Sequence, residues 1–195
     1  CHHIGHHDKT VHEGKWANHI DWCYWDHPLI ELDGKTAGII GFGRIGQTTG
    51  RIAKALGMKV LAYDPYVKEL PEEFQSYVTL CGENEVISGC DFLSLHLPLN
   101  DETRNMISAP QLASMKAGAY VINAARGGIV NEKDLYEALV SGHIAGAAMD
   151  VSEVEPMAKE NPLRTLDNVI ITPHIGMYSK EAIGAVSLIC AQNVA

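Results

Sequence analysis

Short apolar runs alternate with segments of helical periodicity along the chain from Thr36 onward. This order predicts βαβ units and therefore a parallel sheet. Because the apolar runs are nearly continuous, we expect strands that are covered on both faces, as in a doubly wound α/β fold. The expected strands are 36–42, 59–63, 91–97, 119–125, 144–151 and 168–172, with a weaker one at 77–80, and the expected helices lie within 46–57, 83–90, 109–118 and 131–142.

The first 35 residues have a different pattern, because they hold seven of the ten histidines and all three tryptophans. The segment is too apolar to be disordered and too irregular to be a strand. We expect a helix followed by a long aromatic loop, an arm that packs on another surface such as a second subunit. The chain then forms a single domain, in which 1–35 are the arm, 36–176 the core and 177–195 the start of a C-terminal helix.

Histidine pairs near the N-terminus raise the possibility of a metal site. His2 with His6, and His3 with His7, are four residues apart and can share a helix face as metal ligands. The alternative is a polar helical stretch whose imidazoles contact water or carbonyls. No H-E-x-x-H motif and no cysteine pair completes a set of ligands, so we predict no metal.

The composition argues against several classes of protein. A formal net charge of −9 opposes non-specific binding to nucleic acid or anionic membranes, which needs clustered Lys and Arg. No apolar run approaches the roughly 18 residues of a membrane span, and the chain does not open with a secretory signal. The five cysteines are odd in number and lack a CxxC spacing, which indicates reduced thiols. We expect a cytoplasmic protein without nucleic-acid or membrane partners.

A glycine-rich turn follows the first expected strand. Gly41, Gly43 and Gly46 have the GxGxxG spacing and open a helix. In such a turn the first glycine makes the bend, the second admits a pyrophosphate to the helix N-terminus, and the third lets helix and strand pack closely. Asp64 ends the next strand, 18 residues after Gly46, where it can accept hydrogen bonds from both adenosine ribose hydroxyls and repel a 2′-phosphate. The motif predicts a Rossmann-type domain that prefers NAD to NADP; the alternative for Asp64 is a surface turn residue before Pro65.

Three ionisable residues follow three of the later strands. Arg126, Glu155 and His174 each lie just past the end of an expected strand. Ligands of an open parallel sheet bind beyond the carboxyl ends of its strands, so these side chains can converge beside a nicotinamide ring.

Such a set suits the reduction of a 2-keto acid. Hydride addition to a ketone builds negative charge on oxygen, so an acid must supply a proton. His174 can be that acid, Glu155 can stabilise its imidazolium form, and Arg126 can bind the substrate carboxylate or polarise its carbonyl. Each residue also has a structural alternative: Arg126 as a loop cap, Glu155 on a solvated turn, and His174 as a buried histidine with its own partner.

Five ordered motifs make the chain resemble a known family. They are GFGRIG with Asp64, LHLPLNDETRNMI (95–107), NAARGGIVNEKDLYEAL (123–139), GAAMDVSEVEP (146–156) and NPLRTLDNVIITPHIG (161–176). Together they resemble the D-isomer-specific 2-hydroxyacid dehydrogenases over almost the whole chain. The segment HEGKWANHIDWCYW (12–25) most resembles the glycerate dehydrogenase, or hydroxypyruvate reductase, members.

The resemblance implies an oxidoreductase that transfers a hydride between NAD(H) and a small D-2-hydroxy or 2-keto acid, above all glycerate or hydroxypyruvate. It implies that Arg126, Glu155 and His174 are catalytic, with His174 as acid and base. It also implies cofactor-binding residues: Arg44, Ile45 and Asp64 at the adenosine end, Leu97, Pro98 and Thr103 along the groove, and Ala124, Ala125, Asp150 and Gly176 near the nicotinamide, with Asp150 taking its carboxamide. Members of the family are usually homodimers joined through this domain, which fits the aromatic arm.

The chain also departs from the family pattern. The family's substrate domain comes largely from sequence ahead of this point, so we expect a cofactor-binding half that binds NAD and turns over poorly in isolation. Ser152 stands where many members carry Phe, and Met177-Tyr178 where glycerate-type members often have Ala-Trp. Two alternatives stay open: an enzyme like D-lactate dehydrogenase, and an NAD-sensing scaffold like the C-terminal-binding-protein corepressors.

Overall fold

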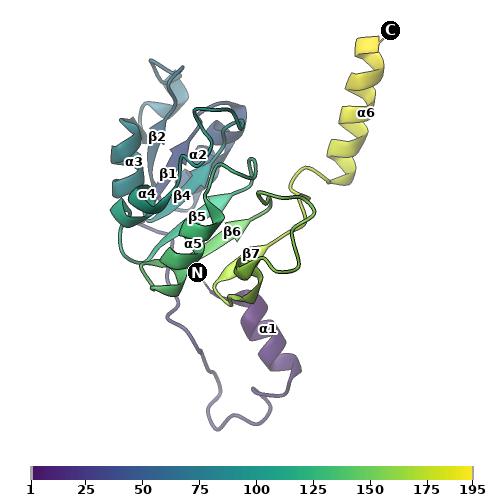
Figure 1. Ribbon diagram of the computed structural model, residues 1–195. Helices are drawn as coiled ribbons and strands as arrows, with labels where there is room; N and C mark the ends of the chain where they lie inside the picture. The colour runs from purple at the N-terminus through teal and green to yellow at the C-terminus, as the bar shows by residue number, and fades with distance from the viewer. Residues whose placement is uncertain (1, 195) are drawn as a thin grey trace.

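The computed structural model describes residues 2–194 and contains one sheet of seven strands (Figure 1). The strands are β1 (Thr36–Ile40), β2 (Lys59–Tyr63), β3 (Val78–Leu80), β4 (Phe92–Leu95), β5 (Ala119–Asn123), β6 (Ile144–Met149) and β7 (Val169–Ile171). Every neighbouring pair is parallel. The predicted doubly wound α/β fold is confirmed, including its weakest strand.

The strand order reverses at β1. The sheet has the order β3-β2-β1-β4-β5-β6-β7, so the chain builds β1 to β3 outward on one side and then returns to place β4 on the other side of β1. Loops that leave β1 and β4 separate at this point. The resulting crevice, beyond the carboxyl ends of the strands, is where such sheets bind ligands.

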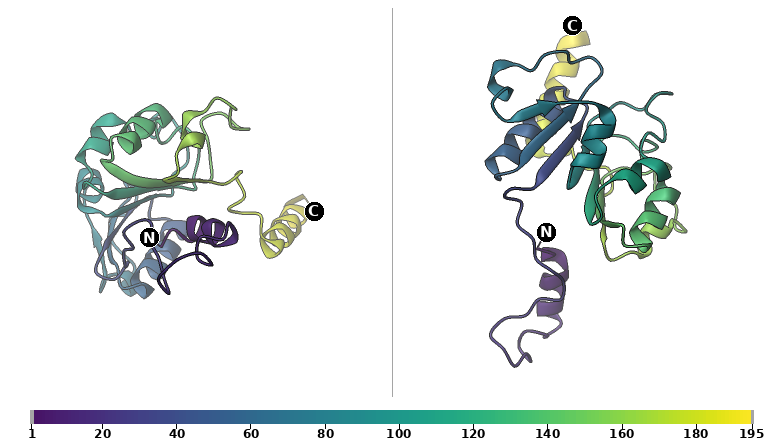
Figure 2. Two further views of the ribbon diagram at one scale, coloured as in Figure 1. Left: turned by 90° about the horizontal axis from the view of Figure 1, so that it is seen from below. Right: turned by 90° about the vertical axis from the view of Figure 1, so that its left-hand side faces the viewer.

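Helices cover both faces of the sheet. α3 (Glu83–Gly89), α4 (Ala109–Ser114) and α5 (Glu132–Val140) lie on one face, and α2 (Arg44–Ala55) lies on the other, over β1 and β2 (Figure 2). Two short 3-10 helices, η1 (Glu72–Phe74) and η2 (Pro162–Thr165), complete the core.

Two apolar cores result, one on each face. Consecutive residues of a strand point to opposite faces, so Ile40 packs into the core beneath α3 to α5 with Leu135. Ile39 packs into the smaller core beneath α2 with Phe42 and Phe74. The cores hold the sheet rigid beneath the loops at its carboxyl edge.

Several strands end before the apolar pattern predicts. β1 stops at Ile40 because Gly41 turns the chain with φ 92°, and β6 stops at Met149. The apolar runs continue past these ends because the following loops are themselves buried, as Phe42 and Val151 show. The pattern therefore reports burial correctly but overestimates strand length where the chain leaves the sheet.

Two segments extend from the body of the protein. α1 (Ile4–His12) and the irregular loop after it lead into β1, and α6 (Lys180–Val194) projects from the opposite end of the chain (Figures 1 and 2). The loop after α1 exposes large apolar side chains, among them Ile20 at 96% and Trp22 at 86%. Among residues 2–194, no helix combines the length and the apolar character that crossing a membrane requires.

The histidines of the arm contact one another and nearby carboxylates. His6 Nε2 lies 2.8 Å from a carboxylate oxygen of Asp26. The ring of His27 lies 4.7 Å from that of His3 and 5.0 Å from that of His6, measured between centroids. In the described part of the chain, no group of three or more His, Cys, Asp or Glu has a geometry that could hold a metal ion.

Candidate active site

The residues singled out from the sequence follow six adjacent strands, in loops or, for those from Arg44 to Gly46, in the first turn of α2. In spatial order they are Asp64 after β2; Gly41, Gly43, Arg44, Ile45 and Gly46 after β1; Leu97, Pro98 and Thr103 after β4; Ala124, Ala125 and Arg126 after β5; Asp150 and Glu155 after β6; and His174 and Gly176 after β7. Because all strands are parallel, these loops lie along one edge of the sheet. They form an extended row rather than a compact cluster, which suits a long ligand such as a dinucleotide.

The three glycines of the turn have three different surroundings. A Cβ at Gly41, where φ is 92°, would lie 2.4 Å from the carbonyl oxygen of His96. A Cβ at Gly46 would lie 2.1 Å from the carbonyl oxygen of Gly41. Nothing lies within 4 Å of a Cβ at Gly43, the residue that caps the N-terminus of α2. The first and third glycines are therefore required by the fold, whereas the second leaves open space at a helix N-terminus, a kind of position that can bind an anion.

Asp64 supports this turn with its own carboxylate. One oxygen accepts a hydrogen bond from the backbone N–H of Phe42 at 2.8 Å, and the other accepts one from Tyr66 at 2.9 Å. The second bond begins the surface turn that the sequence left open as an alternative. Each carboxylate oxygen can accept a further bond, so the structural contacts leave acceptor capacity for a ribose.

The groove residues after β4 divide into two kinds. Leu97 contacts the turn directly, because its Cδ2 would lie 3.1 Å from a Cβ on Gly41. Thr103 is buried, and its hydroxyl donates to the carbonyl of Pro98 at 2.7 Å and accepts from the N–H of Asn100 at 2.9 Å. Thr103 therefore stabilises the conformation of the loop after β4 through hydrogen bonds to its backbone.

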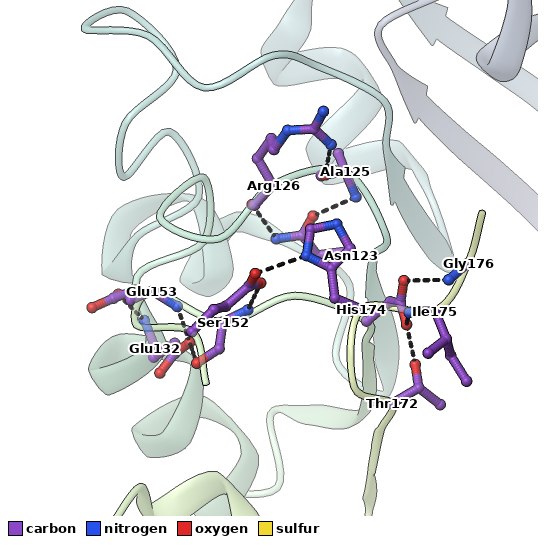
Figure 3. Close-up of polar contacts among 12 residues, drawn as sticks. Asn123, Ala125, Arg126, Glu132, Ser152, Glu153, Thr172, His174, Ile175 and Gly176 are labelled. Carbon is purple, nitrogen blue, oxygen red and sulfur yellow. Dashed lines mark hydrogen bonds and ion pairs between the residues drawn. The ribbon is translucent and has the colours of Figure 1, made fainter. Parts of the chain in front are cut away.

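Arg126 is carried on a loop that a buried asparagine holds in place. Asn123 ends β5 with no exposed surface; its Nδ2 donates to the carbonyl of Arg126 at 3.0 Å and its Oδ1 accepts from the N–H of Ala125 at 3.1 Å. The guanidinium of Arg126 is exposed and donates to the carbonyl of Ala125, and among residues 2–194 it forms no ion pair (Figure 3). Sequence reasoning missed Asn123, although an amide in an apolar strand needs a partner when buried.

His174 has a backbone conformation that is uncommon for a residue other than glycine. Its φ is 54°, in the left-handed region, and such residues typically cost about 1–3 kcal/mol and persist where their surroundings determine them. Asp150 supplies that constraint. Its carboxylate accepts from the Thr172 hydroxyl at 2.5 Å, the Ile175 N–H at 2.9 Å and the Gly176 N–H at 2.8 Å (Figure 3). The resemblance gave Asp150 to the cofactor carboxamide; in the structure its carboxylate holds the turn on both sides of His174.

Burial and hydrogen bonding act in opposite directions on Asp150. Desolvation by burial favours the protonated form, but the bonds from Thr172, Ile175 and Gly176 outweigh it and hold the pKa of Asp150 below its ordinary value. The turn therefore carries a fixed negative charge at neutral pH.

Glu155 and His174 form a direct pair. His174 Nδ1 lies 2.7 Å from Glu155 Oε2, and the other carboxylate oxygen accepts from the N–H of Ser152 at 3.0 Å (Figure 3). The bond with His174 is the largest cause that lowers the pKa of Glu155, followed by the bond from Ser152. The carboxylate is thus charged at neutral pH and fixes the direction of the imidazole. Both residues line a cavity of about 820 Å³ together with Asp150 and apolar residues of η2 and β7.

The sequence of the chain matches the model of a known protein family. The model of the D-isomer specific 2-hydroxyacid dehydrogenase NAD binding domain matches residues 1–176. The chain belongs to this family.

Individual relatives agree with the family match. The chain is 52% identical over 183 residues to a hydroxypyruvate reductase of Blautia hydrogenotrophica, covering 93% of this chain and 56% of the relative. It is 48% identical over 173 residues to a D-3-phosphoglycerate dehydrogenase of Methanocaldococcus jannaschii, covering 87% of this chain and 33% of the relative. The chain thus spans about a third to just over half of these two curated relatives.

Solved structures have the same fold. A D-lactate dehydrogenase of Aquifex aeolicus, complexed with NAD and lactic acid, superposes with a TM-score of 0.85 at 31% identity, covering 99% of this chain and 60% of that chain. A D-lactate dehydrogenase of Lactobacillus jensenii with NAD⁺ gives a TM-score of 0.82 at 33% identity, covering 98% of this chain and 59% of that chain.

The two glycine environments predict opposite phenotypes. Gly43→Ala should leave the free energy of unfolding nearly unchanged, because the methyl group meets open space, but it should weaken NADH binding about tenfold because the pyrophosphate needs that space. Gly46→Ala should destabilise the fold by about 1–3 kcal/mol or more through contact with the carbonyl of Gly41. Urea denaturation and NADH fluorescence titration separate the two effects. Equal losses of stability in both variants would contradict the assignment.

The lowered pKa of Glu155 predicts how the stability of the protein depends on pH. A carboxylate whose pKa is depressed in the folded state stabilises the fold above its ordinary value, 4.5, and this contribution is lost as the pH falls through the folded-state pKa. Glu155→Gln should therefore be less stable than wild type above about pH 4.5, and the difference should shrink at lower pH. Urea unfolding from pH 7 to pH 3 measures it, with the exposed Glu137→Gln as control. If the difference in the free energy of unfolding between wild type and Glu155→Gln stays constant with pH, the Glu155–His174 pair is not the source of that difference.

Proposed function

We propose that this chain carries the cofactor and the proton-transfer groups of an NAD-dependent oxidoreductase that interconverts a D-2-hydroxy acid and a 2-keto acid. The observation that carries the proposal is the Glu155–His174 pair, held at the carboxyl edge of the sheet on a turn whose backbone is constrained. The same row of loops contains the open position at Gly43, which gives a dinucleotide access to the N-terminus of α2.

The residues present suit NAD. We assign the pyrophosphate to the turn at Gly41, Gly43 and Gly46, and the ribose hydroxyls to Asp64, whose charge disfavours a 2′-phosphate. The nicotinamide end then reaches the loops after β5, β6 and β7. Bound NADH supplies the hydride for reduction of the ketone.

His174 delivers the proton in this proposal. Glu155 accepts a hydrogen bond from Nδ1–H, so Nε2 is the ring nitrogen that can donate a proton to the substrate oxygen as negative charge develops there. The negative charge of Glu155 stabilises the imidazolium form before transfer. In the reverse direction, the neutral imidazole accepts the hydroxyl proton.

Arg126 binds the anionic end of the substrate. Its guanidinium is exposed and, within residues 2–194, hydrogen-bonds only to the neighbouring carbonyl of Ala125, so it can turn to a carboxylate without breaking an ion pair. A planar guanidinium matches a carboxylate with two parallel hydrogen bonds. The substrate is therefore a small acid whose carboxylate is adjacent to the reacting carbon.

We favour hydroxypyruvate and glycerate as the substrate pair. The support is the 52% identity to a hydroxypyruvate reductase over 93% of this chain. Pyruvate is the alternative, because D-lactate dehydrogenases are among the similar solved structures.

Turnover of a panel of keto acids tests the proposal. Oxidation of NADH by the full-length protein with hydroxypyruvate, glyoxylate and pyruvate should be fastest with hydroxypyruvate. His174→Ala should lower kcat by about 10²- to 10⁴-fold, the usual contribution of general acid catalysis. Arg126→Ala should lower kcat/KM by about 10- to 100-fold, as expected for a lost charged hydrogen bond.

A second histidine serves as the control. His12→Ala removes an exposed imidazole on α1 and should leave turnover unchanged. Wild-type turnover by His174→Ala would refute the assigned acid. Tight NADH binding with no turnover of any keto acid by the full-length wild type would favour an NAD-sensing scaffold instead.

We propose further that the protein is a homodimer of the cytoplasm. The support for the dimer is the arm, which exposes Trp16, Ile20 and Trp22 together and needs an apolar partner surface. The four cysteines in the described part of the chain are unpaired, which suits a reducing compartment.

Removal of an aromatic side chain from the arm tests the dimer. Trp22→Ser should weaken self-association at least about tenfold, because a buried indole at an interface typically contributes more than 1 kcal/mol. Sedimentation velocity over a range of concentrations measures it, with Val140→Ser on α5 as a control at a comparably exposed site. A wild-type chain that stays monomeric at high concentration would end this proposal.

A further inference from the structure

Glu132 joins the start of α5 to the loop that follows β6. Its Oε1 accepts from the Ser152 hydroxyl at 2.9 Å and from the Glu153 N–H at 2.7 Å (Figure 3). Its Oε2 accepts from Asn161 Nδ2 at 2.6 Å. In return, the carboxylate of Glu153 accepts from the N–H of Glu132 at 2.9 Å. Four hydrogen bonds thus tie one residue to three positions in a loop that has no regular secondary structure.

A carboxylate is well suited to this place. Glu132 is the first residue of α5, where the helix dipole favours negative charge. Its three donors all require acceptors, and a carboxylate offers two acceptor oxygens and no donor. A glutamine would instead direct an NH₂ group at one of these donors, so the charge and the geometry both select glutamate.

Ser152 connects this junction to the Glu155–His174 pair. Its hydroxyl binds Glu132, while its backbone N–H donates to Glu155 Oε1 at 3.0 Å. The other oxygen of Glu155 lies 2.7 Å from His174 Nδ1. A continuous chain of hydrogen bonds therefore runs from α5 to the imidazole.

The loop that carries Arg126 is packed against the same point. A Cβ at Gly127 would lie 1.8 Å from the carbonyl oxygen of Ser152, so the two backbones are in close contact. The Arg126 loop leads into α5 at Glu132, and the Glu155 loop is tied back to Glu132. One junction thus fixes the relative position of the two loops.

We propose that Glu132 and Ser152 are positioning residues, which orient the carboxylate of Glu155, and through it the imidazole of His174, relative to Arg126. This positioning role rests on the proposed function, because the groups that it aligns are the ones assigned to proton transfer and substrate binding. Neither residue contacts the reacting groups in this scheme. They act by restricting the motion of the loop that holds Glu155.

Two variants and one control test the proposal in the 195-residue chain. Ser152→Ala removes one hydrogen bond and leaves the backbone intact, whereas Glu132→Ala removes all three bonds that the carboxylate accepts. Glu137→Ala makes the same chemical change on an exposed position of the same helix. Amide hydrogen exchange reports the loop, and the ¹⁵N chemical shifts of the His174 ring report which nitrogen carries the proton.

The expected effects follow from the number of bonds lost. Exchange of the amides of residues 152 and 153 should accelerate about fivefold in Ser152→Ala and more than about tenfold in Glu132→Ala. In both variants the Nδ1-protonated form of His174 should decrease, because Glu155 no longer faces it steadily. The Ile175 and Gly176 amides, held by Asp150, should be unchanged and serve as an internal control.

Two results would overturn the proposal. If the loop exchanges faster while the ring signals of His174 stay as in the wild type, the junction is an anchor without influence on the imidazole. If neither changes in either variant, the bonds have no positioning role. Failure of the proposed function gives a different result: the full-length wild type oxidises no NADH with any keto acid, while the variants still alter the His174 signals.

Discussion

All seven strands of this protein run in the same direction, and the site depends on that constraint. A parallel strand must be followed by a crossover before the next strand can pair, so each strand releases its chain at the same edge of the sheet. Residues as far apart in sequence as Gly41 and Gly176 therefore lie along the same edge of the sheet. The two apolar cores, one on each face of the sheet, keep that edge rigid. The distances between the loops are therefore set by the distances between the strands.

The sequence predicts those parts of the protein that depend on local pattern. Every strand was located by its apolar run, and the roles of Gly41 and Gly46 follow from their spacing, because steric contact at a tight turn is a local property. The ends of the strands were less accurate. Phe42 and Val151 are buried beyond the sheet, and an apolar residue in a packed loop has the same pattern as one in a strand.

Other parts depend on contacts that no local pattern records. Asp150 was expected to take the carboxamide of the cofactor, which stays a prediction; its hold on the turn around His174 was not foreseen, because that contact spans more than 20 residues of sequence. Ser152 was notable in the sequence only as a departure from the family pattern, and its partner Glu132 was not singled out at all. Both contacts require the register of β5 against β6 and of β6 against β7, which the sequence does not specify by itself. Asn123 was a detectable signal, because a buried amide at a strand end needs partners.

The left-handed backbone of His174 has a consequence for how this position can change over evolutionary time. After glycine, the residues that adopt such a conformation most readily are Asn, Asp and His. Of these, only histidine ordinarily gains and loses a proton near neutral pH. This position thus has two independent requirements, a left-handed backbone and a side chain that exchanges a proton near neutral pH, and histidine meets both. Asn or Asp would meet the first requirement but not the second.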